Sequence, residues 1–194
     1  MIEEDPSGGL YLVRHGVEVD AETATPVRTS VEGLRFDVVF EDGSTGSLGI
    51  DPVHAGSVHV TLLPAERSGV THWGERLALS VDEQVRGLTE QVAGPPDPGT
   101  LDLRGTQLTV APAALPPSAA FHQSSRGYAL HVDGAAAAAY DIGSTRPEVL
   151  DVRVAMPAAV DEPLGYLLLV GTTPVDLLAE HHAAVPEWVD VRWP

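Results

Sequence analysis

Glycine and proline divide this 194-residue chain into short segments. Nineteen glycines and sixteen prolines are spread along its length, and proline both removes a backbone donor and ends helices. Between these residues apolar and polar side chains mostly alternate, which is the pattern of strands with one buried face. The chain therefore excludes a fold built from long helices, and we expect an α+β fold of mostly antiparallel β-sheet.

The alternation is clearest in four segments, which are residues 35–40, 57–64, 126–132 and 149–156. Asp42-Gly43 and Asp133-Gly134, which follow the first and third of them, predict tight hairpin turns. Residues 164–170 are apolar on both faces, so we expect a central, covered strand there. Residues 101–110 are predicted as a further hairpin around Gly105, and residues 188–193 as a last strand.

Two segments carry helix signals. Ser80 and Glu83 have the spacing of a capping box and predict a helix over residues 81–92. Pro174 has the place of a first helical residue, where its missing N–H costs nothing, and it predicts a second helix over residues 174–184.

The two helix signals belong to a possible internal repeat with an offset of about ninety residues, which aligns Leu77 with Leu167 and Leu88 with Leu178. This repeat predicts a pseudo-duplicated (ββββα)×2 arrangement with copies over 8–94 and 99–194. One such unit is too small to bury its sheet alone, so we expect residues 1–194 to form a single globular unit. The alternative is a chance match between two halves rich in alanine and valine.

Charge limits the partners that this chain can have. It has 28 acidic side chains, 11 arginines and no lysine, and its net charge is −17. Phosphate backbones and anionic membranes require clustered cations, and the arginines are spread almost evenly from Arg14 to Arg192. We therefore expect no nucleic-acid partner and no membrane association. The acidic N-terminus is unlike a secretory signal, the longest apolar run is far short of a membrane span, and a cytoplasmic location is expected.

Residues 10–16 end in Arg14-His15-Gly16 and resemble the opening of the histidine phosphatase family. That resemblance implies that His15 is a nucleophile for phosphoryl transfer and that Arg14 binds the phosphate. The second catalytic histidine and the long helices of that family have no counterpart in the sequence. The alternative is a histidine that lies in a core or a groove.

The remaining signals for chemistry are weak. His181 and His182 are adjacent, so on a helix they point about 100° apart, which does not suit one zinc ion. There is no glycine-rich phosphate loop, no nucleophile elbow and no cysteine. We expect no catalytic residue, no metal site and no cofactor. His15, His59 and His131 are the side chains that would line a pocket if the sheet forms one.

Two stretches carry a family resemblance. Residues 150–154, a Leu-Asp-Val-Arg-Val strand, and residues 167–180 resemble the C-terminal part of the SsgA-like proteins of actinomycetes. The resemblance implies a non-enzymatic regulator of cell division and sporulation. It also implies a fold like that of the Whirly and PUR proteins, in which four strands and a helix occur twice.

These observations favour a non-catalytic interaction, scaffold or regulatory protein that binds a protein partner, because excess acid suits a basic surface. An exposed edge strand would let two copies pair, so a homo-oligomer is expected. The alternative is a small-molecule-binding protein or biosynthetic enzyme with a sheet-lined pocket. A remote alternative is a phosphohydrolase of the histidine phosphatase type.

Overall fold

The computed structural model describes residues 9–30, 32–88, 102–110, 120–132, 137–156 and 164–185, and strands predominate in these ranges. The elements are β1 (Gly9–Arg14), β2 (Val17–Ser30), β3 (Gly33–Phe40), β4 (Thr45–His54), β5 (Ser57–Pro64), β6 (Val70–Ala78), β7 (Val85–Gly87), β8 (Thr106–Val110), β9 (Phe121–Ser124), β10 (Tyr128–Val132), β11 (Ala138–Ile142), β12 (Val149–Ala155), β13 (Leu164–Val170) and helix α1 (Pro174–Ala184).

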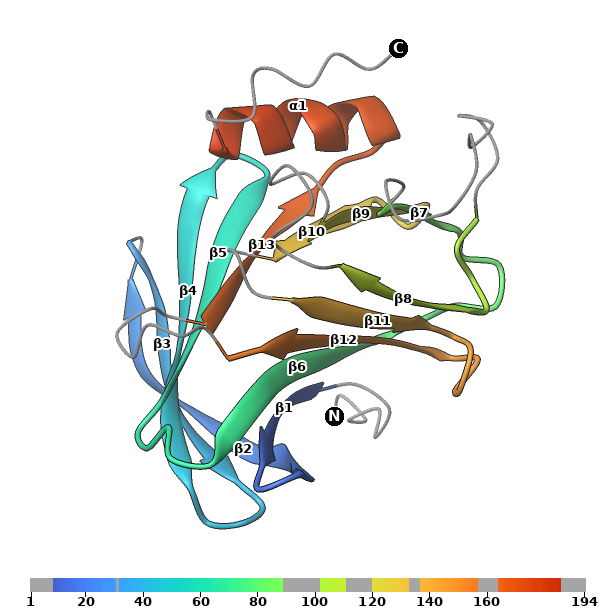
Figure 1. Ribbon diagram of the computed structural model, residues 1–194. Helices are drawn as coiled ribbons and strands as arrows, with labels where there is room; N and C mark the ends of the chain where they lie inside the picture. The colour runs from blue at the N-terminus through green and yellow to red at the C-terminus, as the bar shows by residue number, and fades with distance from the viewer. Residues whose placement is uncertain are drawn as a thin grey trace.

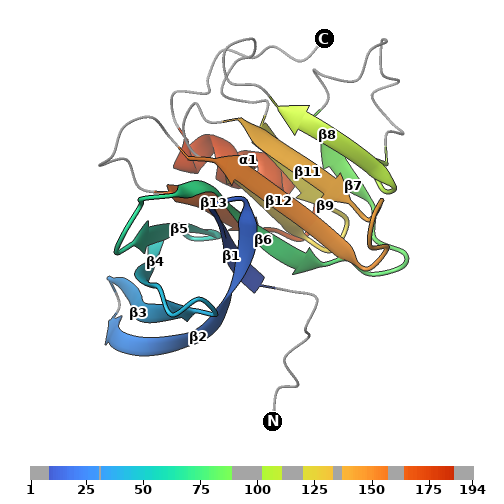
Figure 2. The same cartoon turned by 60° about the horizontal axis from the view of Figure 1, so that its bottom comes forward.

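The strands form one antiparallel sheet that curls back on itself (Figures 1 and 2). Their order is β7-β9-β10-β13-β5-β4-β3-β2-β1-β6-β12-β11-β8. Layer 1 (β1, β6, β12, β11 and β8) faces layer 2 (β5, β13, β10, β9 and β7), and β2 to β4 join them. Two ring contacts cross the sandwich: Trp73 to Tyr166 at 6.1 Å between centroids, and Tyr140 to His122 at 5.6 Å. The prediction of a mostly antiparallel β fold is confirmed.

The main core lies between the two layers. It is aliphatic and aromatic, and its largest fully buried apolar side chains include Phe40, Leu62, Leu130, Tyr140 and Leu150. Helix α1 covers the outer face of layer 2, where it completes a second, smaller cluster. The buried members of that cluster are Phe121, Ala129, Leu167, Leu169 and Leu177.

Helix α1 confirms the prediction for residues 174–184. The side chain of Thr173 accepts a hydrogen bond from the Asp176 backbone N–H at 3.1 Å, and the Asp176 carboxylate accepts one from the Thr173 N–H at 2.9 Å. This reciprocal capping box satisfies two of the donors that a helix N-terminus leaves free. Pro174 follows at the first helical position.

The predicted helix over 81–92 is wrong in its described part, residues 81–88, which form a turn and strand β7. The Glu83 carboxylate does accept the Ser80 N–H at 3.0 Å, as in a capping box. It also accepts the hydroxyls of Ser124 and Tyr128 in the interior, and Glu83 is 2% exposed. Tertiary hydrogen bonds therefore replace the helical turn that the local sequence favours.

Leu88 closes the same segment in a backbone conformation that a helix does not use. Its φ is +55°, and that of Gly87 is +107°. Leu88 is nevertheless buried, and its N–H donates to the Phe121 carbonyl at 3.1 Å. Since the first half of the chain has no such helix in its described residues, the (ββββα)×2 arrangement is not supported.

Several other expectations change in detail. In the segment 101–110, strand β8 begins only at Thr106 after a turn at Gly105. The predicted strand over 188–193 lies outside the described residues. Of the helical segments that are described, none has the length and apolar character needed to cross a bilayer.

Candidate functional site

Tyr11 anchors a polar cluster on the outer face of layer 1. Its partners in the strand register are Asp20 on β2 and Gly74 on β6. A Cβ atom on Gly74 would lie 2.4 Å from the Tyr11 Cζ, so only glycine leaves room for the ring to cross β6. The Tyr11 hydroxyl thereby reaches β12, where it donates to the Asp151 carboxylate at 2.7 Å. Burial raises the pKa of Tyr11 to about 12, which keeps the phenol neutral and able to donate.

Two guanidinium groups cover this ring. The Arg76 Cζ lies 4.2 Å from the Tyr11 centroid and the Arg153 Cζ lies 5.8 Å from it, both within the range of cation–π attraction. The Glu18 carboxylate accepts from both arginines, and Asp20 accepts from Arg76 as well. Strands β2, β1, β6 and β12 are thus joined across their outer face by one network of charges.

The far side of the cluster is set by Asp141 on β11. Its carboxylate accepts from the backbone N–H groups of Ser144 and Thr145 at 2.8 and 3.1 Å, and from the Gln107 amide at 2.9 Å. Burial alone would raise the pKa of Asp141, but the hydrogen bonds from Thr145 and Gln107 lower it. The turn after β11 is therefore held by an ionised carboxylate, and it presents Arg146 beside Asp151 at 4.0 Å.

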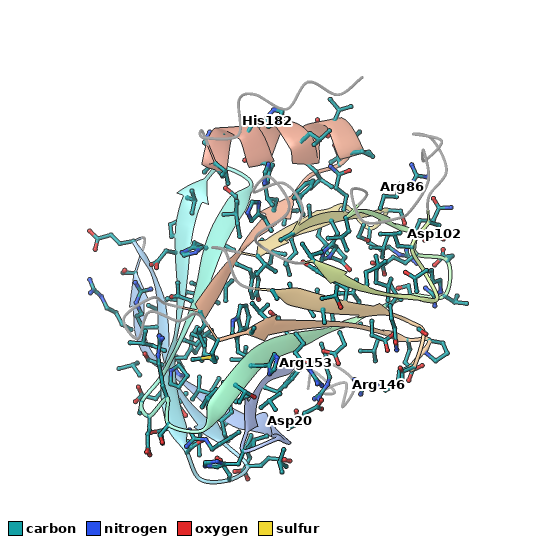
Figure 3. All side chains as sticks on the ribbon, viewed as in Figure 1. Asp20, Arg86, Asp102, Arg146, Arg153 and His182 are labelled. Carbon is teal, nitrogen blue, oxygen red and sulfur yellow. The ribbon has the colours of Figure 1, made fainter. Side chains whose placement is uncertain are left out.

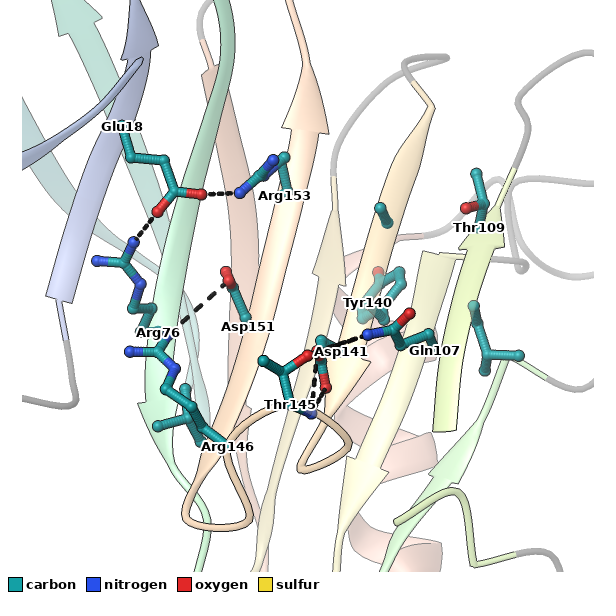
Figure 4. A pocket seen from close by; sticks show the side chains of 13 residues that line it. Glu18, Arg76, Gln107, Thr109, Tyr140, Asp141, Thr145, Arg146, Asp151 and Arg153 are labelled. Atoms are coloured by element: carbon teal, nitrogen blue, oxygen red, sulfur yellow. Dashed lines mark hydrogen bonds and ion pairs between the residues drawn. The ribbon is translucent and has the colours of Figure 1, made fainter. Parts of the chain in front are cut away.

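Many side chains of this cluster line an open hollow of about 550 Å³ on the outer face of layer 1 (Figure 4). Asp20, Arg146 and Arg153 lie on this side of the molecule, whereas His182 lies on α1 at the other end (Figure 3). The ionisable side chains of the lining are three carboxylates and three guanidinium groups, namely Glu18, Asp141, Asp151, Arg76, Arg146 and Arg153. The hollow is therefore close to neutral in a chain whose net charge is −17.

The residues that the sequence singled out lie elsewhere. His15 is in the turn between β1 and β2 with a φ of +50°, and its N–H donates to the Gly69 carbonyl. Arg14 donates to the Glu66 carbonyl at 3.0 Å and lies 3.5 Å from the Asp42 carboxylate. These contacts occupy Arg14 with protein acceptors, and they give no support to the interpretation as a phosphate clamp.

His59 and His131 do not line the hollow. Both pair with Leu167 in the strand register and lie on the outer face of layer 2, beneath α1. Within the described ranges, no group of three or more histidine and acidic side chains is placed to hold a metal ion.

The sequence missed most of the hollow but contained one signal for it. The alternation Leu150-Asp151-Val152-Arg153 predicts that both charged residues lie on the solvent side of a strand, and β12 confirms this. The alternation pattern gave no signal for Tyr11, Glu18 and Arg76. Their strands come near β12 only through strand pairing between distant parts of the chain.

Comparisons with known proteins show the fold alone. No family model and no curated protein matches the sequence. A cycloalternan-forming enzyme from Listeria monocytogenes, solved with a pentasaccharide substrate, has a TM-score of 0.68 at 9% identity over 89% of this chain and 22% of its own. A GH31 family sulfoquinovosidase from E. rectale, solved with an aza-sugar inhibitor, has a TM-score of 0.61 at 13% identity over 93% of this chain and 30% of its own.

This chain therefore spans between a fifth and a third of the length of those solved chains. The architecture of a large enzyme's β-sandwich portion is matched, while the identity is too low to carry over residues or activity. The resemblance to the SsgA-like proteins is tested by none of these comparisons and stays a prediction.

Proposed function

We propose that this chain is a non-catalytic binding module whose hollow on layer 1 holds an uncharged, polyhydroxylated ligand of the saccharide class. The observation that carries the proposal is the composition of the hollow. Three carboxylates and three guanidinium groups from four strands and the turn after β11 converge on one open space of about 550 Å³, a size in the usual range of ligand sites.

The paired charges suit hydroxyl groups better than ions. Carboxylates accept hydrogen bonds and guanidinium groups donate them, so neighbouring Asp151 and Arg146 present an acceptor and a donor to adjacent ligand hydroxyls. An anionic ligand would meet the Glu18, Asp141 and Asp151 carboxylates, and a cationic one the three arginines. A neutral ligand with many hydroxyl groups is repelled neither by the carboxylates nor by the guanidinium groups.

The bonding of the carboxylates supports a role without catalysis. Glycoside hydrolysis commonly uses a pair of carboxyl groups that flank the scissile bond, one of them free to give a proton. Here Glu18 bridges two guanidinium groups, and Asp151 accepts from the Tyr11 hydroxyl. Both side chains join the strands of layer 1. Two enzymes of similar fold, one solved with a pentasaccharide substrate and the other with an aza-sugar inhibitor, agree with the ligand class but do not establish it.

Isothermal titration calorimetry against a panel of neutral mono- and oligosaccharides tests the proposal. Arg146→Gln is the informative variant, because Arg146 is 42% exposed at its side chain and its ion pair to Asp151 is long. We expect it to weaken binding at least fivefold without a change in thermal stability. Arg35→Gln is the matched control, since it removes an arginine of β3 that pairs with Asp51 and does not line the hollow.

Two results would refute the proposal: no saccharide of the panel binding at millimolar concentration to the folded protein, or equal effects of the Arg146 and Arg35 variants. The earlier interpretation, a scaffold or regulator for a protein partner that forms a homo-oligomer, stays a prediction. Light scattering over a wide concentration range checks the oligomer, and co-purification from the native host checks the partner.

A further inference from the structure

Histidines gather where helix α1 packs on layer 2. His131 on β10 and His59 on β5 lie on the outer face of the sheet, and the helix contributes His181 and His182. His131 is 7% exposed and His181 is fully buried. These four are half of the chain's eight histidines, and they come from three elements, β5, β10 and α1.

A hydrogen bond between two of these histidines connects helix α1 to the sheet. The Nδ1 atom of His131 and the Nε2 atom of His181 are 2.6 Å apart, and the two rings stack at 4.9 Å between centroids. Such a bond requires one nitrogen that carries a proton and one that does not. Two imidazolium rings would place two N–H groups and two positive charges against each other, so the bond exists only while at least one ring is neutral.

The charged groups that the structure describes around this pair have bonding partners of their own. Glu180 on the helix binds His54 of β4 at 2.8 Å and the Gly56 N–H at 3.1 Å. On the outer face of β4, Asp51 is held by Arg35 of β3. At the helix N-terminus, Asp176 is used by the capping box. On the helix itself, His182 lies 6.3 Å from the His181 ring, so a proton there adds repulsion.

The apolar contact beneath the helix is small. Its cluster has five buried members, of which Leu177 comes from the helix, and Leu178, Ala184 and Val185 pack against it partly buried. Loss of the histidine bond, with the repulsion that replaces it, therefore removes a substantial part of what holds the helix.

We propose that His131 and His181 form an acid-sensitive latch, which holds helix α1 against layer 2 at neutral pH and releases it when both rings are protonated. Release uncovers the apolar side chains of Phe121, Leu167 and Leu169 on the outer face of layer 2. The latch lies on the opposite layer from the saccharide hollow and does not depend on it.

The direction of the pH dependence follows from the burial of His181. Burial, with His131 and His182 close by, lowers the pKa of His181 to about 3, below the ordinary value of 6.5. The docked helix thus binds fewer protons than the released one. Docking is strongest above pH 6.5 and weakens as the pH falls below it.

Hydrogen exchange measured by mass spectrometry on the whole chain tests the latch. Between pH 7.5 and 5.0, after correction for intrinsic exchange, we expect the protection of the α1 amides to fall at least tenfold. Trp73 fluorescence should stay native, because the two layers remain folded. His181→Phe keeps a ring against Phe121, which lies 4.4 Å away, and should remove the pH dependence.

His131→Leu is the second non-titrating variant, and it gives the same readout if His181→Phe does not fold. His72→Gln is the matched control, since His72 lies on β6, in layer 1, and it should leave the pH dependence unchanged. The proposal is overturned if α1 protection is equal at both pH values, or if it falls equally in the non-titrating variants.

Discussion

The space above Gly74 decides whether the polar network of layer 1 can form. Alanine at this position would put its Cβ 2.4 Å from the Tyr11 Cζ, 2.5 Å from its hydroxyl oxygen and 2.6 Å from the Val152 carbonyl oxygen. All three separations are far below van der Waals contact. The carbonyl belongs to a paired strand and moves little, so Gly74→Ala displaces the Tyr11 ring.

The cost has two parts. Overpacking at a buried position costs about 1–3 kcal/mol, and losing the hydrogen bond from Tyr11 to the Asp151 carboxylate costs about 1.5–3 kcal/mol. We expect Gly74→Ala to lower the free energy of unfolding by about 3–5 kcal/mol on these two grounds. Tyr11→Phe, which removes only the hydroxyl, should cost the second part alone.

Urea denaturation followed by Trp73 fluorescence measures both changes, with an unchanged m-value as evidence that the denatured state is the same. A double-mutant cycle isolates the clash: in the background of Tyr11→Val, Gly74→Ala should cost less by at least about 1 kcal/mol. The reasoning fails if Gly74→Ala changes stability by less than about 0.5 kcal/mol, or if its cost is equal in both backgrounds.

Three further predictions concern buried ionisable groups. Burial raises the pKa of Glu75 in the core, despite an opposing hydrogen bond from a tyrosine. The folded state thus holds the proton more tightly than the unfolded state, and the free energy of unfolding falls as the pH rises above about 4.5. In urea titrations, Glu75→Gln should raise the free energy of unfolding by about 1 kcal/mol or more at pH 8 and by less at pH 4. Glu83→Ala leaves the hydroxyls of Ser124 and Tyr128 without their acceptor and should cost about 2–3 kcal/mol by thermal denaturation; a loss below about 0.5 kcal/mol would contradict that role. Burial lowers the pKa of His122 to about 4. Its contribution to the free energy of unfolding is therefore complete above pH 6.5 and falls by about 2 kcal/mol on going to pH 5. His122→Phe should flatten this dependence of stability on pH, and a dependence equal to that of the wild type would show that another group causes it.

The parts of the fold that the sequence predicts are those in which local pattern and tertiary burial agree. Residues 57–64 and 164–170 match β5 and β13, and residues 174–184 match α1. Helix capping is a local interaction, so the signal at Pro174 survives in the structure. The equivalent signal at Ser80 does not lead to a helix, because the Glu83 carboxylate that accepts the Ser80 N–H also accepts hydroxyls more than forty residues away.

Strand β6 shows a second limit of local patterns. Its inward side chains include Trp73 and also Glu75, which pairs in register with the buried Val152, while the intervening outward position is Gly74. A carboxyl group inside and a glycine outside remove the alternation on which strand prediction depends. The same irregular strand carries the space that Tyr11 occupies, so the segment that is hardest to predict is also the one that organises the candidate site.

The charge argument from the sequence shows why the hollow could not be predicted. An even spread of arginines along the chain indicates no cluster only if strands that meet in the sheet are also close in sequence. Arg76 and Arg153 are 77 positions apart, yet β6 and β12 are direct neighbours, and Arg76 pairs in register with Asp151. Strand β1 then adds Tyr11, and β2 adds Glu18, beside them. Three of the eleven arginines therefore meet in one place, and each lies near a carboxylate. The excess of acid lies outside the hollow, so the net charge of the chain predicts how its whole surface repels anions but not what this nearly neutral site can bind.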